Sequence, residues 1–315
     1  MKKTERFFPL ENSDIKLHAY TWEPDSGEIR GVVQLVHGMA EYIDRYNDFA
    51  EFLTGLGFAV IGHDHRGHGQ SITSLDDLGY FADEGGSKIL LDDIHLVAQY
   101  GAHEWPEPPK FILGHSMGSF LVRRYITLYS DELAGAVIMG TGNVPKGTAS
   151  LGKRLASIIS KSRGGHHVSG VLTGMTLGSY NKAFKPNRTP VDWLSRNEEN
   201  CDRYMEDPFC GFEFTAGAYK DFFTILQEVA GNVDADQIRR SFPILIISGE
   251  LDPVGGKDAC IDVAKQYRYM GLEDVELKLY RDDRHEILNE VDREQVFRDL
   301  GAWFTEKCPA KLPEE

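Results

Sequence analysis

The sequence predicts an α/β fold in which a mostly parallel central sheet is flanked by helices. Short apolar runs typical of buried strands alternate with segments of helical period, which favours a parallel sheet covered on both faces. One of these runs leads through a glycine-flanked serine into a helical segment. The strand signals disappear between residues 141 and 241 and then resume. We therefore expect one core, formed by residues 1–140 and 242–315, into which residues 141–241 are inserted as a helical cap.

The first part of the core is predicted from residue 16 onward. Residues 16–22 alternate polar and apolar side chains and precede the turn residues 23–27, so we expect an antiparallel hairpin with a buried strand at residues 31–36. Periodicity predicts helices at residues 45–56, 90–99 and 117–129, and apolar runs predict strands at residues 58–61, 110–113 and 134–139.

The cap and the second part of the core follow the same reasoning. Two predicted helices of the cap begin with residues that resemble capping boxes, Thr189 with Asp192 and Ser195 with Glu198. The cap helices are expected at residues 151–160, 190–196, 197–207 and 216–229. The core then resumes with strands at residues 242–247 and 275–280 and helices at residues 258–270 and 293–307.

The candidate nucleophile is Ser116, within Gly114-His115-Ser116-Met117-Gly118. A serine at the apex of a tight strand-to-helix turn has a strained backbone, and the neighbouring chain leaves no room for a Cβ at the flanking positions, which explains Gly114 and Gly118. A five-residue pattern is short, and many proteins match it by chance. Its position between a predicted strand and a predicted helix favours the catalytic interpretation over a passive turn.

A serine hydroxyl needs a base, usually a histidine that a carboxylate orients. Asp252 follows the predicted strand at 242–247, at the same edge of the sheet as Ser116, and His285 is the only one of the eleven histidines that lies beyond Asp252. We expect Ser116, Asp252 and His285 to form a catalytic triad. Glu250 and Asp258 remain alternatives for the acid, because Asp252 could instead cap a helix.

The tetrahedral intermediate needs donors for its oxyanion. The helix after Ser116 directs its first N–H groups toward that position, and the loop His37-Gly38-Met39-Ala40-Glu41 follows an early strand. We predict that the backbone N–H groups of Met39 and Met117 form the oxyanion hole. His37 and His115 are interpreted as structural supports of the turn.

The histidine-rich stretch His63-Asp64-His65-Arg66-Gly67-His68 resembles a metal site, because imidazoles at such spacing can bind zinc. Metal-dependent hydrolases of the metallo-β-lactamase type place an aspartate directly before the last histidine, where this chain has Gly67. We therefore predict a hydrogen-bonded loop that braces the active-site edge, with Arg66 binding carbonyls or a carboxylate. No metal or cofactor is expected.

Composition narrows the classes of partner. The net charge is −15, with the acidic residues interpreted as spread along the chain, which disfavours nucleic acid. The basic N-terminus has no apolar run behind it, so we expect neither a signal peptide nor a spanning helix, and we predict a cytoplasmic protein. Cys201, Cys210, Cys260 and Cys308 form no C-x-x-C pair and are expected to be free thiols, although Cys201 and Cys210 are close enough in sequence to pair in an oxidising compartment.

These residues together resemble the α/β-hydrolases of the monoacylglycerol lipase and lysophospholipase-like group, which includes proteins labelled serine aminopeptidases of the S33 type. The resemblance covers nearly the whole chain, with one departure at Ala40, where relatives commonly carry glycine. The matching stretches are Val36-His37-Gly38 with Glu41, residues 63–71, residues 114–118, residues 249–254, His285-Glu286, and residues 192–196 and 207–212 of the cap.

The resemblance implies a lid over Ser116 and hydrolysis of acyl esters through an acyl-serine intermediate, most specifically monoacylglycerol lipase or lysophospholipase activity. Two apolar stripes in the cap fit either an acyl channel with transient membrane contact or mere packing onto the core. The stripes are Leu151, Leu155, Ile158 and Ile159, followed by Val171, Leu172, Met175 and Leu177.

Other activities on the same fold remain open at this point. A short-chain or aryl carboxylesterase would need no long acyl channel. An acyltransferase would prefer an added acceptor to water, and a peptidase would need an acidic site for a substrate amine, for which Glu198, Glu199 and Glu206 are loose candidates. The sequence does not determine the oligomeric state.

Overall fold

The computed structural model describes residues 1–10, 13–232 and 234–308, and its central element is one mixed sheet. The strand order is β1-β2-β4-β3-β5-β6-β7-β8; β2 runs antiparallel to β1 and β4, and the pairs from β4 to β8 are parallel. The predicted α/β fold class is confirmed. The strands are β1 (Lys2–Pro9), β2 (Lys16–Glu23), β3 (Gly31–Val36), β4 (Phe58–His63), β5 (Lys110–His115), β6 (Gly135–Met139), β7 (Ile244–Gly249) and β8 (Val275–Tyr280).

Helices cover both faces of the sheet. Alternate residues of a strand point to opposite faces, so Ile112 packs with α2 (Gly86–Glu104), α3 (Met117–Tyr129) and α8 (Gly256–Tyr269), all on one face. Its neighbour Phe111 packs on the other face with α1 (Asn47–Gly55) and α9 (Arg293–Lys307). This two-sided burial explains why the central strands are continuous apolar runs.

The predicted hairpin between residues 16–22 and 31–36 is wrong. β2 pairs with β4 and with β1, a strand that the sequence did not reveal, while β3 lies between β4 and β5 in the interior of the sheet. β1 is an edge strand with five of its eight residues exposed, so its hydrophobic alternation is weak. The turn at residues 23–27 therefore carries the chain from the outer strands to the centre.

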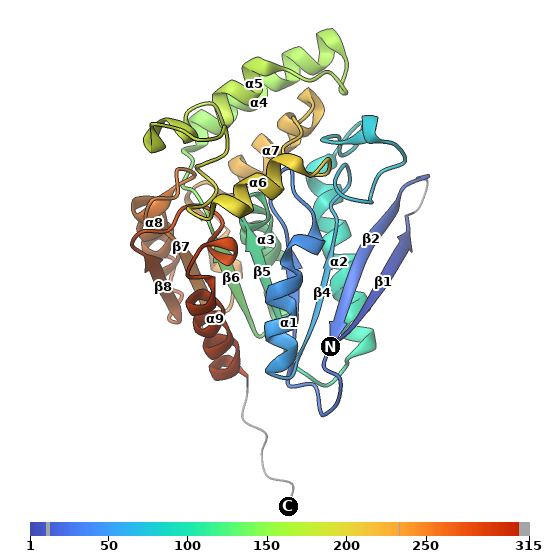
Figure 1. Cartoon of the computed structure of the whole chain (residues 1–315), viewed down its shortest axis with the longest axis vertical. Coiled ribbons are helices and arrows are strands. Elements are labelled where there is room, and N and C mark those ends of the chain that lie inside the picture. Colours follow the sequence, from blue (N-terminus) through green and yellow to red (C-terminus); the bar gives the residue numbers. More distant parts are fainter. Residues whose placement is uncertain (11–12, 233, 309–315) are drawn as a thin grey trace, which may run out of the picture.

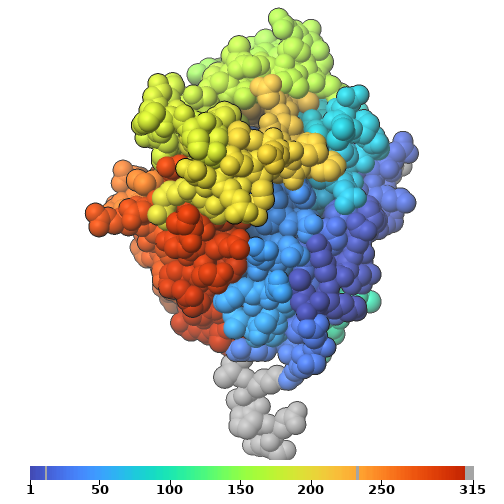
Figure 2. Space-filling view, viewed as in Figure 1, coloured from blue at the N-terminus to red at the C-terminus, as the bar shows by residue number. Residues whose placement is uncertain are grey.

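The chain between β6 and β7, which we call the β6–β7 segment (residues 140–243), is helical. Figure 1 shows its helices gathered at the end of the sheet where Ser116 follows β5, with α4 and α5 outermost. Figure 2 shows the same segment seated on the core. The helices are α4 (Lys146–Arg163), α5 (Gly170–Thr176), α6 (Glu198–Glu206) and α7 (Ala216–Val229). Its interpretation as an inserted cap spanning residues 141–241 stays a proposal.

Two local predictions for this segment were wrong, and one of its helices was missed. Residues 190–196 form a turn and not a helix, α6 is capped by Asn197 and not by Ser195, and α5 was not predicted. The turn retains part of the expected capping geometry, because Asp192 Oδ1 accepts the Thr189 N–H at 3.0 Å. It does not continue as a helix because the Arg284 side chain occupies the carbonyls of Asp192 and Ser195.

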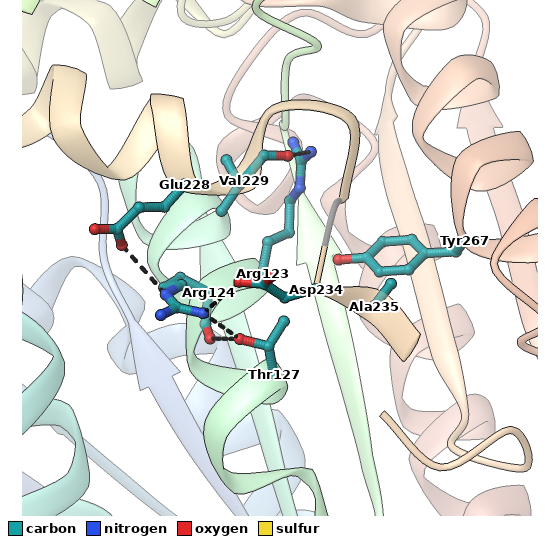
Figure 3. Close-up of a pocket in the computed structure, with 8 residues that line it drawn as sticks. All are labelled: Arg123, Arg124, Thr127, Glu228, Val229, Asp234, Ala235 and Tyr267. Atoms are coloured by element: carbon teal, nitrogen blue, oxygen red, sulfur yellow. Dashed lines mark hydrogen bonds and ion pairs between the residues drawn. The ribbon is translucent and has the colours of Figure 1, made fainter. Parts of the chain in front are cut away.

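One buried arginine of α3 attaches both ends of the segment to the core. Arg123 donates to the carbonyl of Gly142 at 2.8 Å, just after β6, and to that of Val229 at 3.0 Å, at the end of α7. Arg124 next to it pairs with Glu228 and Asp234 (Figure 3). The small pocket in Figure 3 lies among these anchoring contacts. The helix that begins at Ser116 therefore also holds the base of the β6–β7 segment.

Candidate active site

Ser116 lies between β5 and α3 in a backbone conformation that non-glycine residues rarely adopt, with φ 53° and ψ −119°. Such strain persists only where the surroundings enforce it. Here a Cβ on Gly114 would lie 2.3 Å from the Gly118 carbonyl oxygen, and one on Gly118 would lie 2.1 Å from that of Val36. Both glycines are therefore required by the turn, and the turn presents the Ser116 side chain at the surface of the sheet edge.

Asp252 contacts His285 directly. The Asp252 Oδ1 atom lies 2.9 Å from His285 Nδ1, and both side chains are buried. Asp252 is itself oriented by the Val254 N–H at 2.9 Å and the Ser248 hydroxyl at 3.1 Å. The alternative acids lie elsewhere, because Glu250 pairs with Lys257 and Asp258 is exposed in the first turn of α8.

Ser116 and His285 flank the end of β6. The Ser116 N–H donates to the Met139 carbonyl at 3.0 Å, and a Cβ on the next residue, Gly140, would lie 3.3 Å from His285 Cε1. No hydrogen bond joins the Ser116 hydroxyl to His285 Nε2 in this structure. Catalytic hydrogen bonds often tighten only when substrate is bound. The structure thus brings Ser116, Asp252 and His285 to one place, without a hydrogen bond between Ser116 and His285.

The loop after β3 runs beside Ser116. A Cβ on Gly38 would lie 3.0 Å from Ser116 Cβ, and the Gly38 N–H is already bound to Glu41 Oε1 at 2.7 Å. Within the described residues the Met39 N–H has no acceptor, and Met117, as the first residue of α3, has no intrahelical acceptor for its own N–H. These two groups are therefore available to a ligand.

Ala40 adopts the left-handed conformation, with φ 52°, which glycine adopts more readily than alanine. Its carbonyl accepts the Tyr204 hydroxyl and the Gly211 N–H, each at 3.0 Å. Its N–H lies 3.3 Å from His68 Nε2. Two residues of the β6–β7 segment and one histidine of the core thus hold the strained residue of this loop in place.

A buried ionic network lies beneath the loop. Glu41 contacts His115 at 3.0 Å and Arg45 at 2.8 Å, and Arg45 binds Glu286 through both guanidinium Nη atoms. Burial opposes ionisation of Glu41, but the His115 and Arg45 contacts outweigh burial and hold the pKa of this carboxyl far below its usual value. Asn200 of α6 completes the network through Glu286 at 2.7 Å.

The histidine-rich loop braces the site as predicted. His65 N–H donates to His37 Nε2 at 2.9 Å, Asp64 binds the His18 ring at 2.7 Å, and Arg66 binds the Asp93 carboxylate in a bidentate pair. Burial lowers the pKa of His68 to about 3, so its imidazole is neutral and can accept the Ala40 N–H. The His18, His37, His65 and His68 rings thus serve as hydrogen-bonding groups of the loop, whereas the buried His63 ring has no hydrogen-bond partner among the described residues.

Within the described residues, the acidic groups whose oxygens converge closely enough for a cation are Asp283, Glu290 and Asp292. Arg196 lies among them and pairs with all three. The chain itself thus supplies the positive charge at this place.

Sequence reasoning missed several residues around the site. Trp193 lies against His285 with ring centroids 5.1 Å apart, and Tyr204 and Asn200 reach the core loops from α6. No local pattern marks them, because each contact joins chain positions far apart in sequence. Glu198, Glu199 and Glu206 of the peptidase alternative are exposed on α6 and offer no enclosed site for an amine.

Comparison with known proteins places this geometry in context. Residues 27–292 match the family model described as serine aminopeptidase, S33. The chain is 28% identical over 291 residues to a monoacylglycerol lipase of Mycolicibacterium smegmatis, covering 90% of each protein. It is 26% identical over 300 residues to the monoglyceride lipase of Mus musculus, covering 92% of this chain and 86% of the other.

Solved structures agree with the fold. A thermostable carboxyl esterase from Bacillus coagulans, in complex with glycerol, superposes with a TM-score of 0.90 and 27% identity, covering 98% of this chain and all of the other. A protein described as a lipase in its open form gives a TM-score of 0.87 at 25% identity, covering 98% and 99% of the two chains.

Proposed function

The chain belongs to the serine aminopeptidase, S33 family of α/β-hydrolases, and we propose that it hydrolyses the ester bond of acyl lipids, as a monoacylglycerol lipase or lysophospholipase. It is a hydrolase of the lipase and esterase group. The observation that carries the serine mechanism is the Asp252–His285 hydrogen bond beside the strained Ser116 turn.

The proposed mechanism assigns one role to each group. His285 Nε2 takes the Ser116 proton as the Ser116 Oγ attacks the ester carbonyl, and Asp252 keeps the other ring nitrogen protonated and oriented. The Met39 and Met117 N–H groups stabilise the oxyanion. His285 then donates its proton to the leaving alcohol, and later activates the water that releases the fatty acid from Ser116.

The two apolar stripes of the β6–β7 segment support a lipid substrate. Some of their residues pack onto the core, and others are exposed and free to contact a lipid surface. Leu155, Ile159 and Leu172 pack toward the core, whereas Leu151 and Ile158 of α4 are 63% and 64% exposed. Val171 and Met175 of α5 are exposed as well. The inward residues account for packing, and the outward ones form an apolar surface that fits transient contact with a lipid interface.

The charge distribution supports the same surface and corrects the expectation of evenly spread acidic residues. Residues 133–191 contain eight Lys and Arg and no Asp or Glu, in a chain whose net charge is −15. On α4, Leu151, Arg154, Ile158 and Lys161 are all exposed at helical spacing. We propose that this face, which we call the α4 face, contacts anionic lipid. None of the helices in the described part of the chain combines the length and apolar character needed to cross a bilayer.

Fatty-acid release from monooleoylglycerol tests the proposal, with Ser116→Ala as the matched variant. We expect release by the wild type and a loss of several orders of magnitude in turnover for Ser116→Ala. Equal rates for the two proteins would refute the serine mechanism. Release from aryl or short-chain esters alone would favour the carboxylesterase alternative, and product transfer to an added alcohol in preference to water would favour an acyltransferase.

A further inference from the structure

The turn at residues 190–197, which we call the Trp193 turn, is attached to the loop that carries His285. The Glu286 N–H donates to the Leu194 carbonyl at 2.7 Å. Further hydrogen bonds join the two segments, among them Arg284 Nη1 to the Ser195 carbonyl at 3.1 Å, the Arg196 N–H to Glu290 Oε1 at 3.0 Å, and Asn197 Nδ2 to the Asn289 carbonyl at 3.0 Å. The turn therefore moves with the His285 loop.

An ion-pair cluster strengthens this attachment. The Arg196 guanidinium pairs with Asp283 and Glu290, whose side chains are 1% and 0% exposed, and with Asp292 at 3.0 Å. Buried carboxylates are costly unless a cation stays beside them. Moving Arg196 away would leave these acidic groups buried without a cation, which costs free energy. The ion pairs therefore hold the Trp193 turn in the position that the structure shows.

The fixed turn places an indole on His285. The ring centroids of Trp193 and His285 are 5.1 Å apart with an interplanar angle of 36°, and the His115 ring lies at 4.7 Å from the same imidazole. The Trp193 backbone N–H donates to Asn181 Oδ1 at 2.9 Å, and the Tyr180 ring packs on the indole at 5.0 Å. Asn181 and Tyr180 thus add contacts from within the segment to the attachment that already holds the Trp193 turn on the His285 loop.

Each charged group near His285 has a defined partner. Asp252 binds His285 itself at Nδ1, Glu286 is paired with Arg45, and Arg284 donates to backbone carbonyls. The His115 ring binds Glu41 through Nδ1 and approaches the His285 carbonyl through Nε2. Tyr180, beside Trp193, is kept neutral because burial raises its pKa to about 12. Trp193 therefore offers the imidazole a neutral aromatic surface.

We infer that Trp193 is a positioning residue whose indole stabilises the imidazolium formed when His285 takes the Ser116 proton. The inference rests on the proposed serine mechanism. A cation within about 6 Å of an indole ring is attracted by its π electrons, and the attraction grows when water is excluded. Because the charge exists in the transition state and not in the resting enzyme, the contact favours catalysis over ground-state binding.

The kinetics of the Trp193→Leu and Trp193→Phe variants on a soluble short-chain ester test whether Trp193 stabilises the His285 imidazolium. We expect kcat of Trp193→Leu to fall about 3- to 30-fold with KM nearly unchanged, and Trp193→Phe to fall less. We also expect the acid limb of the kcat/KM profile to move to lower pH in Trp193→Leu, by about half to one pH unit, because the protonated form loses its partner. A change in KM alone, or an unshifted acid limb, would overturn the inference.

Indole fluorescence gives a readout that does not depend on activity, because a protonated imidazole in contact with an indole quenches its emission. The wild type should show a change in indole emission when the pH is varied between about 5 and 8. Both His285→Gln and Trp193→Phe should abolish it. A change that persists in either variant, or its absence from a folded wild type, would refute the contact.

Turnover of Ser116→Ala, compared with that of Trp193→Leu, separates the proposed serine mechanism from the proposed role of Trp193. An unchanged turnover of Ser116→Ala would refute the serine mechanism even if the fluorescence titration is present. A normal loss of turnover in Ser116→Ala with no effect of Trp193→Leu would refute only the role of Trp193. Thermal unfolding of each variant identifies loss of fold, and the milder Trp193→Phe keeps the test valid if Trp193→Leu is unstable.

Discussion

The outer and inner parts of the β6–β7 segment differ in what they do with their charged and apolar side chains. The α4 face is exposed and carries cations in a stretch of sequence that has no Asp or Glu. The Trp193 turn and α6 instead bury their polar groups against the core, where Arg196, Asn200 and Tyr204 contact the loops around His285 and Ala40. The comparison teaches that one segment of the chain can contain a fixed half that contacts the loops of the candidate site and an exposed half that is available to an interface.

Removing the charge that attaches the inner half should have the largest effect on stability. Arg196→Ala leaves Glu290 buried without its cation and forces Asp283, whose pKa burial already raises to about 7, to take up a proton, so we expect a loss of about 3–5 kcal/mol in the free energy of unfolding, measured by urea denaturation. The matched control is Arg188→Ala, which removes an exposed pair with Asp202 and should cost at most about 1 kcal/mol. Equal losses in the two variants would show that the attachment is no stronger than a surface ion pair.

The inner half reaches the buried network of Glu41 through Asn200, Glu286 and Arg45. Glu41→Gln should destabilise the protein by about 2–4 kcal/mol near neutral pH, since it removes the carboxylate that faces the buried His115 ring and leaves Arg45 with Glu286 as its one remaining carboxylate partner among the described residues. Because the folded-state pKa of Glu41 is lowered, its contribution is present above the ordinary value of 4.5 and is lost as pH falls toward the folded pKa. The difference between wild type and variant should therefore shrink by at most about 1.4 kcal/mol per pH unit below pH 4.5. A difference that is independent of pH between 3 and 7 would contradict the ionised state of Glu41.

Substitutions of cations in the outer half should weaken binding to anionic membranes and leave the stability of the fold unchanged. The double variant Arg154→Gln with Lys161→Gln removes two exposed cations from the α4 face and should weaken binding to vesicles containing phosphatidylglycerol by about 30-fold, at roughly 1 kcal/mol per cation. Unfolding and turnover of a soluble ester should be unaffected. Neutralising two exposed lysines elsewhere, Lys2→Gln with Lys265→Gln, is the control. An equal loss in the control pair would mean that no particular face is used.

The smallest effect is expected where the inner half holds a strained residue. Ala40→Gly relieves the left-handed conformation but makes the unfolded chain more flexible, so the unfolding free energy should rise by no more than about 1 kcal/mol. Turnover should stay within a few-fold, because Tyr204 and Gly211 still bind the carbonyl of residue 40. A large loss of turnover would show that the Ala40 methyl group itself matters to the site.

The sequence was most informative where the signal is local. The apolar runs and helical periods predicted α3, α7, β8 and α9 at the residues where the structure has them, because burial on a regular element imposes its own period. The Gly114 and Gly118 positions likewise follow from one tight turn. Chain order also suggested that Asp252 and His285 meet, and the structure places them 2.9 Å apart, since strands of a parallel sheet end at one edge.

What the sequence by itself determined is therefore the α/β class, the order of the core elements and the residues that the strands present at their carboxyl ends. Only the tertiary structure decided the pairing of β2 with β1 and β4, the turn at residues 190–197, and the contact of Trp193 with His285. The physical reason is that periodicity reports burial along one element. Partner choice across the chain depends on which surfaces meet once the whole core has closed.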